Sequence, residues 1–535
     1  MSARETKNTK LKYAVSGGGM VSTAFPLATD AGCAMLKAGG NAVDAACAAA
    51  WTLGVCEPQA SGAGGQTMML IYDGKKIVAV DGSSRAPSLA HVSAIYKADR
   101  ALGYRASTVP STPATLAYVQ RIYGTLPGEQ IMEPAIAIAE NGYKITPLQH
   151  RLQSEQIGNF AKIESRSGYD HFLKNGAPWP VGSIFRQDDL AMLLRTLARK
   201  GIEEFYTGSI AKQIDADMRE NGGLLRYDDL ALIPWPIIRK PLRRGFRKYR
   251  IYSMPPPGAG RSLLFALMMT DAIPAKLLKD TDRRRLHILA EIFRRTLLER
   301  SDRPYDPNFY AQHHEKDMLD REYARECIAG ISRAVDKTLL PSLITEDEIS
   351  GETTHLSVID KNNMAVSLTQ SIERVYGSKA AAAGLGFLYN NYMYDFEYKL
   401  PRNPYYLRPN AVPWASVAPS LVFKKEDLWM ALGSPGSGRI FSCLAQFLIH
   451  VIDEKMSLYD AMVAPRLHCS LGGRISIEKD RFPEGVTEYL LAKGYRIDIR
   501  EPYAFYLGAV HAAAKSGGEF QGVAEIRRDG TAGGI

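Results

Sequence analysis

The pattern of apolar and polar positions changes along this chain, from helical spacing in the first part to strand-like alternation beyond residue 352. Helical spacing predicts helices over residues 28–37, 42–53, 114–123, 131–141, 190–201, 208–221, 262–271 and 286–300. Alternation predicts strands over 68–72, 76–81, 355–360, 364–369, 420–423 and 428–432. Asn41 is placed to cap the second helix. The order of elements suits two layers of sheet flanked by helices.

Composition indicates a large buried core, and the polar start of the chain bears on its expected location. The chain has 535 residues, of which 46% are apolar and 23% charged, as in ordinary globular proteins. No apolar stretch is long enough for a transmembrane helix, so no membrane association is expected. The polar start, Met1 to Tyr13, precedes no signal-like apolar run, so we expect a cytoplasmic enzyme.

The net charge of +9 is concentrated in a basic stretch at residues 239–250. Such a cluster can attract nucleic acid or an acidic substrate. No nucleic-acid motif accompanies it, so a solvated surface is the better interpretation. A salt-dependent shift assay would decide between the two.

Cysteine and histidine spacing gives no sign of a metal or cofactor. None of the six cysteines forms a C-x-x-C pair, and they are interpreted as small buried apolar residues. The histidines do not fall at ligand spacing with carboxylates, and no phosphate-binding G-x-x-x-x-G-K sequence occurs.

The segment that carries the chemistry is Gly351-Glu352-Thr353-Thr354-His355-Leu356-Ser357-Val358. It opens a predicted strand after a polar stretch. Alone it is weak, since any Thr-rich strand alternates in this way. His355 invites a Ser-His type of interpretation, but 353 and 355 share a strand face, and packing is the commoner role for such a histidine.

The chain resembles the gamma-glutamyltranspeptidase family from about Gly19 to its end. The matching stretches, in family order and spacing, are PLATDAGCAMLKAGGNAVDAACAA, EPQASGAGG, the VPST segment at Val109, MEPAIAIAENGY, the MPPP turn at Met254, TTHLSVID, AVSLTQSI, LYNNYMYDF and GSPGSGR. Each stretch is weak alone, and their joint occurrence is highly specific.

The resemblance implies an α+β fold, a four-layer αββα sandwich of the N-terminal-nucleophile hydrolase type. It also implies a proenzyme that cuts itself between Glu352 and Thr353, giving a large fragment, 1–352, and a small one, 353–535. The two fragments would remain together as a heterodimer. Thr353 would then provide both the nucleophilic hydroxyl and, through its free α-amine, the base.

The resemblance also implies roles for residues around Thr353. Ser371 matches the hydroxyl that supports the nucleophile, where relatives usually have Thr. Gly436 and Ser437 match the turn whose backbone amides form the oxyanion hole, although relatives have glycine at the second position. Asp395 matches the carboxylate that binds the substrate ammonium.

The substrate side departs from the family pattern. Ser83 stands where relatives have the arginine that holds the substrate carboxylate, and Arg85 could replace that arginine only if its loop reoriented. Ala415 and Ser416 stand for a pair of serines, so one hydroxyl is missing. Glu373 replaces an asparagine near the ammonium, and Tyr392 replaces a further polar contact. The ammonium side is altered but charged, whereas the carboxylate side is depleted.

These features predict cleavage of a small amide through a Thr353 ester, with the acyl group passed to water or an amine. A γ-glutamyl substrate is kept slightly ahead because Asp395 and Glu373 can receive an ammonium. An amide of another acid, such as oxamate or the acyl side chain of a β-lactam, is the close alternative. An uncut, non-catalytic binding protein is the alternative from another class.

Overall fold

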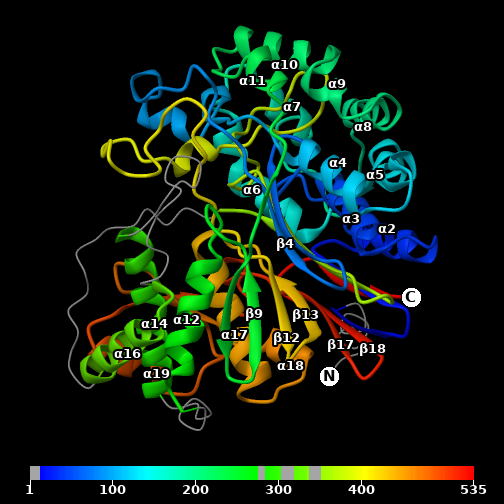
Figure 1. Ribbon diagram of the computed structural model, residues 1–535. Coiled ribbons are helices and arrows are strands. Elements are labelled where there is room, and N and C mark those ends of the chain that lie inside the picture. The colour runs from blue at the N-terminus through cyan, green and yellow to red at the C-terminus, as the bar shows by residue number, and fades with distance from the viewer. Residues whose placement is uncertain (1–11, 275–282, 303–317, 336–350) are drawn as a thin grey trace.

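Two antiparallel sheets lie face to face in the computed structural model, which describes residues 12–274, 283–302, 318–335 and 351–535 (Figure 1). The first has seven strands in the order β19-β2-β10-β11-β3-β4-β7 and the second seven in the order β1-β18-β17-β13-β12-β9-β8. The strands of the first are β2 (Gly19–Thr23), β3 (Gln66–Tyr72), β4 (Ile77–Gly82), β7 (Ile237–Arg239), β10 (Thr354–Asp360), β11 (Ala365–Ser371) and β19 (Thr531–Gly534). Those of the second are β1 (Tyr13–Ser16), β8 (Leu242–Phe246), β9 (Tyr249–Ser253), β12 (Ser420–Lys424), β13 (Asp427–Gly433), β17 (His511–Ser516) and β18 (Glu519–Ala524).

Helices cover the outer face of each sheet (Figure 1). On the first sheet they include α2 (Pro26–Lys37), α3 (Ala42–Cys56), α4 (Thr112–Tyr123), α5 (Gly128–Asn141), α6 (Pro147–Phe160), α8 (Asp188–Lys200) and α10 (Ser209–Glu220). On the second they include α12 (Gly260–Asp271), α14 (Arg283–Asp302), α16 (Arg321–Val335), α17 (Ile440–Ile452) and α18 (Leu458–Val463). A small sheet of β14 (Leu467–Cys469), β15 (Arg474–Glu478) and β16 (Arg496–Arg500) lies beside α19 (Val486–Ala492).

Three apolar cores separate the four layers. Leu356 and Val358 of β10 join the core beneath α2 and α3, whereas Ile359 joins the core between the sheets. Met430 of β13 joins the core beneath α12 and α17. Because successive strand residues point to opposite faces, each strand supplies both an inter-sheet and a helix-facing layer. The predicted αββα sandwich is confirmed.

The predicted cap of the second helix is present. The side chain of Asn41 accepts hydrogen bonds from the backbone amides of Val43 and Asp44, at 2.9 and 3.1 Å, and Asp44 accepts from the amide of Asn41 at 2.9 Å. This reciprocal capping box fixes the start of an alanine-rich helix that packs closely on α2.

The division into a helix-rich first part and a strand-rich second part was too simple. Residues before 352 supply four strands of the first sheet and three of the second. Three of these, β7, β8 and β9, hold the basic stretch 239–250, whose arginines obscure the apolar alternation. Arg239, Arg247 and Arg250 there pair with Asp81, Asp453 and Glu426, at 2.7, 2.9 and 2.5 Å. Carboxylates therefore neutralise part of this positive charge.

Candidate active site

Thr353 and Ser371 face each other at the end of the central strand pair of the first sheet. Antiparallel pairing of β10 with β11 sets Thr354 opposite Gln370 and His355 opposite Thr369. The same register, continued by one residue, brings Thr353 to Ser371. Both side chains are buried. Strand pairing therefore joins two hydroxyls that lie 18 residues apart in the sequence.

One hydroxyl connects Thr353 to the peptide bond that precedes it. Thr353 Oγ1 donates to Ser371 Oγ at 3.2 Å, and Ser371 Oγ donates to the carbonyl oxygen of Glu352 at 2.8 Å. The backbone amide of Glu373 donates to the same Ser371 oxygen at 2.8 Å. Ser371 is thus positioned both to orient the Thr353 hydroxyl and to polarise the carbonyl that this hydroxyl would attack.

The side chain of Glu352 lies in a buried charged cluster. Both its oxygens accept hydrogen bonds from the Nη1 and Nη2 atoms of Arg528, the second at 3.1 Å. Glu57 lies close by, and burial raises the pKa of its carboxyl to about 8, an effect that Arg528 opposes and Glu352 reinforces. Burial also raises the pKa of Glu352, and Arg528 opposes that rise, so the guanidinium favours the charged form of both carboxyls.

The glycine-rich turn after β13 lies beside the same peptide bond. A Cβ atom on Gly433 would lie 2.2 Å from the His355 ring, so only glycine lets the two sheets approach there. A Cβ on Gly351 would lie 2.5 Å from that of Ser437, which places this turn against the residue before Glu352. Ser437 has φ of 52°, so it adopts the left-handed backbone that relatives reach with glycine. Its amide is therefore held in the predicted turn at a cost in backbone strain.

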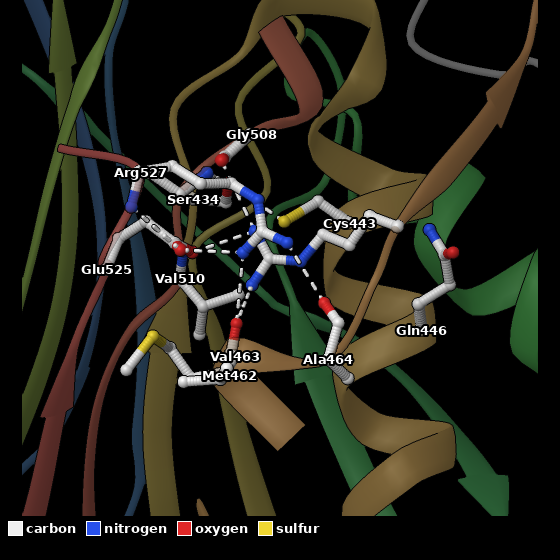
Figure 2. Close-up of polar contacts among 12 residues, drawn as sticks. Ser434, Cys443, Gln446, Met462, Val463, Ala464, Gly508, Val510, Glu525 and Arg527 are labelled. Atoms are coloured by element: carbon white, nitrogen blue, oxygen red, sulfur yellow. Dashed lines mark hydrogen bonds and ion pairs between the residues drawn. The ribbon is translucent and has the colours of Figure 1, made fainter. Parts of the chain in front are cut away.

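A buried ionic network supports that turn from behind (Figure 2). Arg527 contacts Glu478 at 2.7 Å and Glu525 at 2.8 Å, and Arg466 contacts Glu525 at 2.7 Å and the carbonyl of Gly508 at 3.2 Å. Burial alone would raise the pKa of Glu525, but the two arginines overcome it and hold the pKa at about 2.

The network reaches the turn through one short loop. The amide of Ala509 donates to Ser434 Oγ at 2.9 Å, and a Cβ on Gly436 would lie 3.1 Å from the Cα of Gly508. The loop around residue 508 therefore transmits the rigidity of the ionic network to residues 434–437.

His355 has the structural role that its strand position predicts. Its Nδ1 pairs with Thr369 Oγ1 at 2.9 Å and its Nε2 with Ser357 Oγ at 3.0 Å. Burial holds the pKa of the ring well below its usual value, and His511 lowers it further. The ring is therefore neutral and engaged between the two sheets.

A pair of carboxyls lies on the other side of Ser371. Glu373 has φ of 78°, and its side chain hydrogen-bonds with Asp395, the last residue of a 3₁₀ turn that begins at Tyr392. Burial raises the pKa of Glu373 to about 7, and the nearby Arg374 guanidinium opposes that rise. Tyr392 is fully buried, and its hydroxyl meets Ser371 and Gln66. The sequence-predicted residues Glu373, Tyr392 and Asp395 are therefore brought together beside Ser371.

The four residues at the positions predicted to bind a substrate carboxylate lie in different surroundings. The Ser83 hydroxyl donates to Asp81, which also pairs with Arg239. The partly buried Arg85 lies on a loop that pairs with Val109, whose amide donates to the Arg85 carbonyl at 2.8 Å. Ala415 is packed in the inter-sheet core, and Ser416 beside it is partly buried. Ser83 is thus engaged with a structural carboxylate.

Comparison with known proteins agrees with this geometry. A family model described as gamma-glutamyltranspeptidase matches residues 28–535. The chain belongs to the gamma-glutamyltranspeptidase family.

Its relatives carry two kinds of name. It is 32% identical over 538 residues to an "Acylase ACY 1 proenzyme" of Pseudomonas sp. (strain SE83), covering 97% of this chain and 94% of the relative. It is 31% identical over 516 residues to the "Glutathione hydrolase proenzyme" of Escherichia coli (strain K12), covering 90% and 86%. The solved structure of a cephalosporin acylase from Bacillus halodurans superposes with a TM-score of 0.89 at 27% identity, covering 98% of this chain and 97% of that one. The chain, as a member of the gamma-glutamyltranspeptidase family, is thus an enzyme of the N-terminal-nucleophile hydrolase type.

Sequence reasoning missed the charged residues around Glu352. Arg528 lies 176 residues from its partner Glu352 in the sequence, in a segment outside the quoted stretches that match the family. Glu57 lies within the quoted EPQASGAGG stretch, but spacing gave no reason to assign it to the cleavage site. The pairing of β19 with β2, beside β10, brings the segment of Arg528 to Glu352, and Glu57 reaches the same place at the end of α3.

The described part of this family member shows neither a metal cluster nor a membrane span. Within residues 12–274, 283–302, 318–335 and 351–535, no group of three or more His, Cys, Asp or Glu side chains is placed to hold a metal ion. In the same residues, no helix is long and apolar enough to cross a membrane.

Proposed function

We propose that this enzyme cuts itself between Glu352 and Thr353. Thr353 Oγ adds to the carbonyl carbon of Glu352, the C–N bond breaks, and the proton lost by the Thr353 hydroxyl is transferred to the nitrogen that leaves as the free amine of Thr353. The resulting ester is hydrolysed by water, which releases the carboxylate of Glu352 and restores the Thr353 hydroxyl. The observation that carries this proposal is the hydrogen-bonded chain from Thr353 through Ser371 to the Glu352 carbonyl.

The two fragments, 1–352 and 353–535, would remain together after cleavage. Strands of the two fragments pair with each other within each sheet: β10 pairs with β2 and β11 with β3 in the first, and β18 pairs with β1 and β12 with β9 in the second. Separating the fragments would break these pairings and expose the inter-sheet core. We therefore expect a heterodimer of the chain's own parts.

Cleavage would turn Thr353 into a complete catalytic unit. A free α-amine has a pKa near ~8, far closer to neutrality than that of a hydroxyl, so it can accept the hydroxyl proton directly or through water. Thr353 Oγ then attacks the amide of a substrate, and the acyl group passes to water or to an amine. Backbone amides of Gly436 and Ser437 are proposed to stabilise the oxyanion, a contribution of about 3–4 kcal/mol for such donors.

The acyl group is the open part of the proposal. A γ-glutamyl amide is supported by the Glu373–Asp395 carboxyl pair beside Ser371, which can receive the substrate ammonium. An amide of another acid is supported by the engagement of Ser83 with Asp81 and by the acylase relatives, since nothing at Ser83 then supplies a bidentate clamp for a carboxylate. Arg85, Ser416 and Tyr392 are the remaining candidate contacts.

Intact-mass analysis of the purified chain beside its Thr353→Ala variant tests self-cleavage. We expect two fragments for the wild type, the smaller beginning at Thr353, and one uncut chain for the variant. An uncut chain in both would reject this mechanism and favour a non-catalytic binding protein.

Matched anilides of γ-glutamate, glutarate and 4-aminobutyrate then identify the acyl group. The three differ only in the α-amine and the α-carboxylate. Preference for γ-glutamate would show that both groups are bound, whereas preference for 4-aminobutyrate would show an ammonium site without a carboxylate clamp. Preference for glutarate would contradict the assignment of an ammonium to Glu373 and Asp395.

A further inference from the structure

The Glu352 side chain is bound as closely as the peptide bond that it precedes. Glu352 is fully buried, and Arg528, with 1% of its side chain exposed, contacts both of its carboxylate oxygens. The Arg528 guanidinium also stacks on the Phe505 ring, with 4.1 Å between its central carbon and the ring centroid. Two hydrogen bonds and a stacked ring fix the direction of the guanidinium, and hence of the carboxylate.

The loop that carries Arg528 is itself tied down. Lys12 Nζ donates to the carbonyl oxygens of Glu525, Arg528 and Gly530, at 3.0, 2.7 and 2.6 Å. The loop continues into β19, which pairs with β2, the neighbour of β10 in the same sheet. The position of the Arg528 guanidinium is therefore set relative to the strand that begins at Thr354.

Glu352 is consequently held at three points. Its amide donates to the carbonyl of Glu373 at 2.7 Å, its carbonyl accepts from Ser371 at 2.8 Å, and its side chain contacts Arg528. The first two contacts alone leave the residue able to pivot about them. The third removes that freedom, and only it depends on the identity of the side chain at residue 352.

Stability alone gives a poor reason for this ion pair. Buried ion pairs contribute little net stability, because the cost of removing both charges from water offsets their attraction. The adjacent Arg527 shows a different arrangement, because it contacts Glu478 and Glu525 and not Glu352. An ion pair on the residue whose carbonyl would be attacked can instead fix the position of that carbonyl.

We propose that Arg528 is a positioning residue for self-cleavage, which holds the Glu352 carbonyl in line with Thr353 Oγ through the Glu352 carboxylate. This inference rests on the self-cleavage proposed above. It assigns to the Glu352–Arg528 pair a role in maturation that neither residue type nor spacing reveals. A displacement of about 1 Å at a reacting group can cost about 100-fold in rate.

The test measures the rate at which freshly purified chain converts into two fragments. We expect Arg528→Ala to mature about 100-fold more slowly. Arg528→Lys keeps the charge but loses the paired contact, so it should be intermediate. Glu352→Gln should also be slow, and adding it to Arg528→Ala should slow maturation little further, since both changes remove one contact.

Chemical rescue separates positioning from general support. Guanidinium ion, added below its unfolding concentration, should enter the space left in Arg528→Ala and accelerate fragment formation at least 5-fold, while urea, which has the same shape without the charge, should not. Arg247→Ala is the matched control, because it loses a contact with the buried Asp453 at the end of α17, which packs on the second sheet and not on the sheet of Thr353. It should mature at the wild-type rate, with or without guanidinium.

The outcomes distinguish this proposal from the one beneath it. If the wild type is never cut, the self-cleavage mechanism fails and this inference fails with it. If the wild type is cut but Arg528→Ala matures at the wild-type rate, or guanidinium accelerates it no more than urea does, only the role of Arg528 is overturned. Circular dichroism verifies that each variant is folded. If Arg528→Ala does not fold, Arg528→Lys takes its place in the test.

Discussion

Ser371 Oγ lies 3.2 Å from Thr353 Oγ1 and accepts its hydrogen bond while donating to the carbonyl of Glu352. The same hydroxyl therefore contacts both partners of the bond that we propose is cut. After such cleavage the carbonyl would leave and the contact with Thr353 would be retained. A side chain at this point should thus influence maturation and turnover alike.

Replacement of Ser371 by alanine should impair both processes. In maturation the variant loses a hydrogen-bond donor to the Glu352 carbonyl, which typically costs about 10²–10³-fold in rate. In turnover it loses the partner that orients the Thr353 hydroxyl, and a misplaced reacting group can cost about 100-fold. Fragment formation is measured by intact mass and turnover by release of an anilide. Ser371→Thr keeps the hydroxyl and should remain within about 10-fold of the wild type.

Ser367 provides the control for this prediction. It lies on the same strand, and its hydroxyl donates to the carbonyl of Leu432 at 2.8 Å, away from Thr353. Ser367→Ala should mature and turn over normally. Equal losses in Ser367→Ala and Ser371→Ala would show that strand packing, and not the contact with Thr353, is responsible.

Replacement of Ser437 by glycine should stabilise the protein. A side chain in left-handed backbone costs about 1–2 kcal/mol, which glycine removes. Part of that gain is lost, because glycine also gives the unfolded chain more conformational freedom. We expect the free energy of unfolding to rise by up to about 1 kcal/mol, measured with urea, while the amide of residue 437 still donates. Activity should therefore be retained.

Lys425, which also has a positive φ of 58°, is a control outside the site. Lys425→Gly should give a similar gain in stability. If Ser437→Gly instead loses activity while Lys425→Gly does not, the serine side chain itself takes part in the reaction.

Acid should weaken the network that supports the glycine-rich turn. The pKa of Glu525 is held at about 2, below its usual 4.5, so its ion pairs stabilise the fold above about pH 4.5 and this stabilisation is lost as the pH falls toward 2. We expect the free energy of unfolding to fall steeply between pH 5 and pH 3 at constant ionic strength. Glu525→Gln should cost about 3–5 kcal/mol at pH 7 and show a shallower dependence on pH.

The exposed Glu519, at the start of the strand β18 that ends one residue before Glu525, is the comparison for this experiment. Glu519→Gln should behave like the wild type at every pH. A wild-type slope retained in Glu525→Gln would assign the acid sensitivity to other carboxylates.

The sequence predicts the layers of the fold better than the residues that surround Thr353, and the role of Thr353 as nucleophile stays a prediction. Helices α5 and α8 follow from local periodicity because each buries one face, whereas α3, β10 and β11 are buried all round. Ser371 and Asp395 followed from family motifs, and their place beside Thr353 depends on strand register. Arg528, by contrast, meets Glu352 only because distant strands share a sheet, and no local pattern encodes that. The expected cytoplasmic location stays a prediction.

The pH dependence of substrate choice tests the Glu373–Asp395 pair. Burial raises the pKa of Glu373 to about 7, so the pair gains a negative charge as the pH rises through neutrality. An acyl group with an ammonium should then bind more tightly, whereas one without it should not. The α-amine of Thr353 also titrates near ~8, but it affects every substrate equally.

The ratio of kcat/KM for a γ-glutamyl anilide to that for a glutaryl anilide removes this shared effect. We expect the ratio to rise between pH 6 and pH 8 in the wild type, and to become nearly independent of pH in Glu373→Gln, which cannot ionise. A ratio that is flat in the wild type would mean that no substrate ammonium meets this pair, and would leave the acyl-amide alternative as the better account of the pocket.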